Sequence, residues 1–221
     1  HHPDEETFGY ILSKTAHRPV YTRGYPSWGI QHMYYQLEKG DIFKTLPNPD
    51  YVVYVFISDH ARRMQKLIYD FWSDGAYLRY EEKNGKLVQI KPILEPLWKL
   101  NAVKVYLTNL EYKVRAAYDK HDENFDLLEK YLFSSQEILK QHNPNVKFIV
   151  LKYNGGDGFD QWFLDTERWK EIKDKGIIVI DADKELGVDL KDKKYLDPDN
   201  YHPNSYAWEK ISEMLSKKYI K

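Results

Sequence analysis

The chain has 221 residues, of which 42% are hydrophobic and 30% charged, an ordinary balance for a globular protein. A formal net charge of −1 excludes a whole-chain field that would attract nucleic acid or an anionic membrane. The absence of cysteine excludes disulfides, thiolate zinc sites and a cysteine nucleophile, and no apolar run approaches the ~20 residues of a membrane span.

Two helices and a strand are expected in the first 40 residues. The acidic residues from Asp4 and the apolar spacing after them predict a helix that runs to about Thr15. Arg18–Arg23 is typical of a short strand, and Gly24–Gly29 is a loop rich in turn formers. A second helix is expected from Ile30 to about Gly40.

Three apolar runs without alternation predict strands buried on both faces of a parallel sheet. They are Tyr51–Ile57, Val146–Leu151 and Gly176–Ile180. Helical patterns lie between them at about 124–141 and after them from about Tyr206. Strands alternating with helices predict an α/β fold with a parallel sheet.

One segment, from about residue 65 to 121, interrupts this alternation and is interpreted as an insertion in a single domain spanning residues 1–221. It contains a predicted hairpin, with strands at Tyr77–Glu82 and Lys86–Ile90. The turn Lys83-Asn84-Gly85 carries the Asn-Gly pair that favours a two-residue turn.

The clearest chemical motif is Asp199-x-x-His202-Pro203, which immediately precedes the last predicted helix. At this spacing the Asp199 carboxylate can reach the His202 imidazole and hold its tautomer, so that His202 acts as a general base toward a hydroxyl. Taken alone, such a pair is also common in ordinary loops.

This placement resembles the final block of the SGNH (GDSL-type) hydrolases, and two further segments resemble blocks of that family. Arg23–Gly29 resembles the second block, typically Asn-x-Gly-x-x-Gly, and Pro49–His60 resembles the third, which ends Gly-x-Asn-Asp. The resemblance implies a three-layer α/β/α sandwich with a parallel, flavodoxin-like sheet. It also implies a serine that attacks an acyl ester, with His202 as base and Asp199 as its orienting partner.

The resemblance also implies substrate and oxyanion contacts from Ser27, Gly29, Ser58, Asp59 and His60. Ser27 aligns with the family's oxyanion glycine, so its backbone N–H can still donate. Asp59 aligns with the family's asparagine, and an ionised carboxylate there repels an oxyanion. An alternative is that Asp59 caps a helix beginning at His60.

The family's nucleophile block, Gly-Asp-Ser, has no counterpart in these residues, and Ser27, Ser58 and Ser205 are better explained as turn or strand-end residues. We therefore expect the nucleophile in about ten residues of strand and turn upstream of His1. His32 and His60 are interpreted by default as partly exposed helix histidines, with lining of the pocket as the alternative. Asn154–Gly158 is interpreted as a mobile loop.

The sequence thus predicts an esterase-like domain that acts on an O-acyl ester of a carbohydrate or a lipid-like molecule. The 19 tyrosines favour carbohydrate slightly, although a tyrosine-rich core and surface would explain them as well. The sequence predicts no cofactor, no metal and no nucleic-acid partner. It does not indicate the cellular compartment. The alternative is a non-catalytic binding or scaffold module derived from the same fold.

Overall fold

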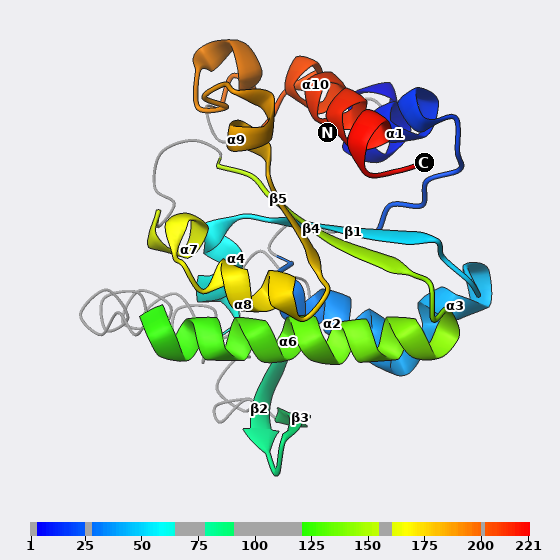
Figure 1. Cartoon of the computed structure of the whole chain (residues 1–221), viewed down its shortest axis with the longest axis vertical. Coiled ribbons are helices and arrows are strands. Elements are labelled where there is room, and N and C mark those ends of the chain that lie inside the picture. The colour runs from blue at the N-terminus through cyan, green and yellow to red at the C-terminus, as the bar shows by residue number, and fades with distance from the viewer. Residues whose placement is uncertain (1–3, 25–27, 65–77, 91–120, 155–160, 200–201) are drawn as a thin grey trace, which may run out of the picture. The chain divides into compact units, whose positions relative to one another are not determined.

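The computed structural model describes residues 4–24, 28–64, 78–90, 121–154, 161–199 and 202–221 (Figure 1). These residues form two compact units, and each is described by itself. The first unit takes its described residues from His1–Gly24, Tyr51–Ser58 and Lys147–Lys221, and the second from Tyr25–Asp50 and Asp59–Val146. The organisation as a single domain stays a prediction.

The first unit is built on a three-stranded parallel sheet in the order β1-β4-β5. Its strands are β1 (Tyr51–Phe56), β4 (Lys147–Lys152) and β5 (Ile178–Asp181), which confirms the three predicted strands and their parallel pairing. β4 lies between two strands and is buried from its second residue onward. β1 pairs with β4 alone among the described residues and is mostly half buried, so burial on both faces was wrong for β1.

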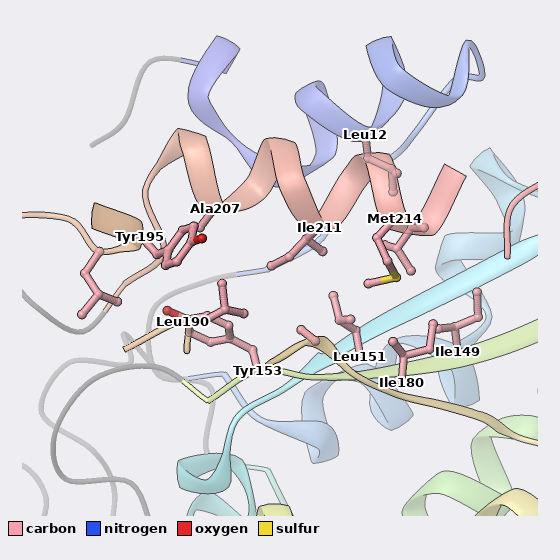
Figure 2. Close-up of a cluster of buried hydrophobic side chains, with 13 residues drawn as sticks. Leu12, Ile149, Leu151, Tyr153, Ile180, Leu190, Tyr195, Ala207, Ile211 and Met214 are labelled. Atoms are coloured by element: carbon pink, nitrogen blue, oxygen red, sulfur yellow. The ribbon is translucent and has the colours of Figure 1, made fainter. Parts of the chain in front are cut away.

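Two helices far apart in the sequence pack side by side over one face of this sheet (Figure 1). They are α1 (Phe8–Ala16) and α10 (Ser205–Lys218), both near their predicted positions. Figure 2 shows Leu12 of α1 and Ile211 of α10 turned toward Leu151 and Ile180 of the sheet, all of them almost completely buried. This cluster is the hydrophobic core of the first unit.

Short helices occupy the loops of the first unit. They are η1 (Asp4–Glu6), α7 (Trp162–Asp165), α8 (Trp169–Asp174), α9 (Ala182–Leu186) and η3 (Lys193–Tyr195).

The predicted strand at Arg18–Arg23 is wrong, because this segment follows α1 as an irregular chain. A strand requires a ladder of backbone hydrogen bonds to a neighbour, and within the described residues this segment belongs to no sheet. Tyr21 is 59% exposed. Arg18 instead donates a hydrogen bond from Nη2 to the Lys221 carbonyl.

The second unit contains α2 (Ile30–Lys39), α3 (Asp41–Thr45) and α6 (His121–His142). α2 and α6 were predicted, and α6 is longer than the pattern indicated. Gly40 ends α2 with φ 71°, a left-handed conformation that glycine adopts without a steric penalty. The six-residue helix α4 (Ser58–Arg63) follows β1 along the chain.

The predicted hairpin is confirmed as β2 (Arg79–Lys83) and β3 (Lys86–Ile90), an antiparallel pair. Its turn residues Asn84 and Gly85 have φ 53° and 78°, the positive values that a tight hairpin turn requires. Tyr80 of β2 makes edge-to-face contacts with Tyr34 and Tyr131. The rest of the predicted insertion, residues 65–77 and 91–120, lies outside the described residues, as do residues 155–160 of the glycine-rich run.

Candidate functional site

The predicted contact between Asp199 and His202 is formed in the loop before α10. His202 Nδ1 lies 2.5 Å from Asp199 Oδ2, and the His202 backbone N–H donates to Asp199 Oδ1 at 3.1 Å. With the Nδ1 proton directed at the carboxylate, Nε2 keeps its lone pair and can accept a proton. The His202 side chain is 73% exposed, so this acceptor is open to a ligand.

Asn204 holds this loop closed, and sequence reasoning gave it no role. Its Oδ1 accepts from Ala207 N and caps α10, while its Nδ2 donates to the carbonyls of Lys194 and Leu196. An Asn directly before a predicted helix is a recognisable N-cap signal that could have identified it.

Backbone hydrogen bonds also close the loop that carries Asp199 and His202. Leu196 and Pro203 form an isolated antiparallel bridge, and Asp197 N donates to the His202 carbonyl at 2.8 Å. The Asn204 backbone N–H donates to the Tyr195 carbonyl at 3.0 Å. The loop that carries Asp199 and His202 is therefore anchored at both of its ends.

Tyr153 places this loop at the carboxyl end of the sheet. It directly follows the last residue of β4 and is only 2% exposed. Burial raises the pKa of its hydroxyl above the ordinary value, and the charges of Asp183, Asp197 and Asp199 raise it further. Ligand sites of open α/β sheets lie at this edge.

A small cavity of about 110 Å³ opens at the ends of β4 and β5. It is lined by Lys152, Asn154, Gln161, Leu164, Asp165, Asp181, Asp183 and Lys184. Lys152 is buried, and its Nζ lies 3.1 Å from Asp181 Oδ2 and also donates to the Leu164 carbonyl. This ion pair crosses between the two strands at one register position.

Burial acts on three charged groups that line this cavity, Lys152, Asp181 and Asp183. It lowers the pKa of Lys152, against the opposing charge of Asp181. Burial alone would raise the pKa of Asp181, but Lys152 and hydrogen bonds bring it below its usual value. Burial raises the pKa of Asp183, whose Oδ1 accepts from Leu190 N.

A second polar cluster, in the second unit, surrounds Asp59 and Arg63. Arg63 Nε lies 2.5 Å from Asp59 Oδ2, and Arg63 Nη1 donates to the Trp28 carbonyl at 2.7 Å. Because α4 begins at Ser58, Asp59 lies inside its first turn, and the alternative in which Asp59 caps a helix beginning at His60 was wrong. An acidic and a basic residue four apart was the sequence signal for this pair.

Two histidines of this cluster are held neutral by their surroundings. Burial and the charge of Arg63 lower the pKa of His60 to about 3. His32 is 4% exposed, and its Nδ1 accepts a hydrogen bond from Gly29 N at 3.1 Å. The expectation of a partly exposed helix histidine was therefore wrong for His32.

The remaining predicted contacts fall in different places. Ser27 lies outside the described residues, and the backbone N–H of Gly29 is engaged by His32. Ser58 is 2% exposed, and its hydroxyl has no hydrogen-bond partner among the described residues. The structure brings Asp199 together with His202, and Asp59 together with Arg63.

The described residues contain no group of three or more histidine, aspartate or glutamate side chains arranged to hold a metal ion. None of their helices is both long enough and apolar enough to cross a membrane.

No family model matches the sequence. The chain is 27% identical over 120 residues to Obg-like ATPase 1 of Xenopus laevis, a stretch that covers 54% of this chain and 28% of that protein. The chain thus spans little more than a quarter of the length of the curated relative it matches. A similarity of this extent assigns the chain to no family.

Many ATPases carry a phosphate-binding loop with the pattern Gly-x4-Gly-Lys-Ser/Thr. Gly24 and Gly29 have the spacing of its two glycines. Ile30 and Gln31 occupy the positions of its lysine and its hydroxyl residue, so this segment lacks the side chains that contact phosphate and Mg²⁺.

Proposed function

We propose that this chain is the acid–base part of a serine-type esterase that acts on O-acyl esters. The observation that carries the proposal is the Asp199–His202 contact at 2.5 Å in a loop anchored at the carboxyl end of a parallel sheet. Asp199 orients the imidazole, and His202 Nε2 takes the proton from an attacking hydroxyl and later returns it to the leaving alcohol.

The proposed fold is the three-layer, flavodoxin-like sandwich of the SGNH hydrolases, in which the nucleophilic serine ends a strand upstream of His1. The parallel order β1-β4-β5 and the last helix after the Asp199–His202 loop support this arrangement. The resemblance in the segment that ends at His60 supports it further.

A carbohydrate is the favoured acyl carrier because an exposed aromatic ring lies next to the loop. Tyr206, in the first turn of α10, is 45% exposed. Its ring stacks on the buried Tyr195 with 3° between the planes and 5.6 Å between the centroids. Lys210 Nζ lies 5.5 Å from the Tyr206 centroid, so a sugar at this ring would meet both an apolar surface and a hydrogen-bond donor.

The test is hydrolysis of acetylated oligosaccharides by the protein extended at its N-terminus with the residues encoded upstream of His1. We expect acetate release, a loss of about 10³-fold or more in kcat for His202→Ala, and a smaller loss for Asp199→Asn. Tyr206→Ala should raise KM with little change in kcat. An in-frame start without an upstream serine would contradict the proposal.

A non-catalytic binding module is the second candidate. One observation favours it: among the described residues, no serine hydroxyl forms a hydrogen bond with His202. In that case the extended protein should bind acetylated oligosaccharides without releasing acetate, and His202→Ala should leave that binding intact.

A further inference from the structure

The sequence contains two Asn-Gly pairs, Asn84-Gly85 and Asn154-Gly155. In such a pair the backbone nitrogen of the glycine can attack the side-chain carbonyl carbon of the asparagine, because glycine has no Cβ to hinder the approach. The attack requires the asparagine side chain and the following backbone nitrogen to move until they meet. The fold therefore decides how fast each pair reacts.

Asn84 and Gly85 form the turn between β2 and β3, and both residues are exposed. Both have positive φ, as a two-residue hairpin turn requires. Apart from its neighbours in the chain, no atom lies within 4 Å of a Cβ added at Gly85. The space around this turn is therefore open, and water reaches the Asn84 amide.

The end of the hairpin next to this turn opens easily. Lys83 and Lys86 occupy paired positions directly beside the turn, and like charges at such positions destabilise the pairing. β2 and β3 form a two-stranded sheet, and a hairpin of this kind is only marginally stable by itself.

Contacts farther along β2 hold the strand in place while the turn opens. Tyr80 is 1% exposed, and its hydroxyl donates to Glu38 Oε2 at 3.1 Å. Glu82 forms an ion pair with Lys130 of α6. These contacts confine the opening to the turn, so Asn84 reacts without unfolding of the second unit.

Asn154 lies in a different setting, two residues after the end of β4. Its side-chain Oδ1 is buried, and its backbone N–H donates a hydrogen bond to the Asp183 carboxyl group. This pair can react only after a local opening that exposes the amide and breaks the hydrogen bond. The same dipeptide should therefore react at different rates in its two places.

We propose that Asn84 is a site of spontaneous deamidation in the folded protein and that the fold protects Asn154. The Gly85 nitrogen forms a bond to Asn84 Cγ, and the bond between Cγ and Nδ2 breaks. Ammonia leaves with the proton from the Gly85 N–H, and a succinimide ring remains. Water then adds to either carbonyl of the ring and gives aspartate or isoaspartate.

The two products should affect the hairpin differently. Aspartate brings a carboxylate beside Lys83 and Lys86, and Asp-Gly favours the same turn as Asn-Gly. Isoaspartate adds a carbon to the main chain and disturbs the pairing of the two lysines. No residue of the Asp199–His202 loop takes part, so this modification and the proposed function are tested independently.

The experiment is incubation of the 221-residue chain in mildly alkaline buffer, followed by digestion after glutamate and mass spectrometry of the peptides that carry each asparagine. We expect Asn84 to convert at least about tenfold faster than Asn154. Asn84→Gln should abolish conversion at that position, because the longer side chain closes the ring poorly. Asn154→Gln is the matched control and should leave the rate at Asn84 unchanged.

Incubation in concentrated urea separates the effect of the fold from that of the local sequence. In the unfolded chain the two pairs should convert at nearly equal rates, and both should convert faster than Asn84 does in the folded protein. Equal rates at Asn84 and Asn154 in the folded protein would overturn the inference. A ratio of the two rates that is the same in urea as in buffer would overturn it as well.

Discussion

Asn204 should contribute more to the stability of the folded protein than Asp199 or His202, the two residues whose loop it closes. It caps α10 and satisfies two carbonyls of the preceding turn, whereas Asp199 and His202 form an exposed pair. We expect Asn204→Ala to lower the free energy of unfolding by about 1–2 kcal/mol. Asp199→Ala should lower it by less than about 1 kcal/mol. Urea denaturation measures the loss of stability in each variant. A loss in Asn204→Ala no larger than that in Asp199→Ala would contradict this expectation.

His60 should make the folded protein sensitive to acid. Its folded pKa of about 3 lies below the ordinary value of 6.5, so below pH 6.5 the unfolded chain binds a proton that the folded chain does not. Its contribution to stability is therefore complete above about pH 6.5 and is lost toward pH 3, at about 1.4 kcal/mol per pH unit.

The variant His60→Gln should flatten this part of the stability–pH curve, measured by urea denaturation from pH 7 to 4. A His60→Gln curve that parallels the parent would show that His60 is protonated in the folded protein.

At the scale of elements, one ion pair joins β4 to β5. Lys152 and Asp181 occupy paired positions and Lys152 is buried, so removing the lysine leaves the Asp181 carboxylate with only the exposed Lys184 as a counter-charge. We expect Lys152→Met to cost about 3–5 kcal/mol in the free energy of unfolding. Lys184→Met is the matched control, because Lys184 contacts the same carboxylate but is 71% exposed. Its cost should stay below about 1 kcal/mol.

The Lys152–Asp181 pair should also make the stability of the sheet depend on pH. The folded pKa of Asp181 lies below 3.8, so its stabilisation is present above about that pH and is lost as the pH falls through the folded pKa. Lys152→Met removes the main cause of the lowered pKa. The variant should therefore lose less stability than the parent between pH 4 and 2, as measured by thermal denaturation.

At the scale of the whole molecule, labelling by a fluorophosphonate probe tests whether any serine of these 221 residues is a nucleophile. We expect no covalent labelling, because no described serine contacts His202 and the buried Ser58 is not open to the probe. Mass spectrometry of the intact chain gives the readout. Stoichiometric labelling that disappears in His202→Ala would place the nucleophile inside this chain.

Local patterns predicted the elements that have a strong period or turn signal. The apolar runs at β1, β4 and β5 and the Asn84-Gly85 turn specify their structures within a few residues. The Arg18–Arg23 segment was misassigned because extended residues become a strand only beside a partner, and no local pattern shows whether a partner is there.

The Asp199–His202 pair could be predicted from sequence alone, because three residues in a tight loop keep the carboxylate and imidazole within reach. Tertiary structure decided the burial of Lys152 against Asp181 and the neutral state of His60, since desolvation depends on residues distant in the sequence. It also decided that Asp59 faces Arg63, because α4 begins at Ser58 and turns both side chains to the same side. The sequence by itself therefore determined the strands and the contact between Asp199 and His202, whereas packing determined the charge and accessibility of the groups around them.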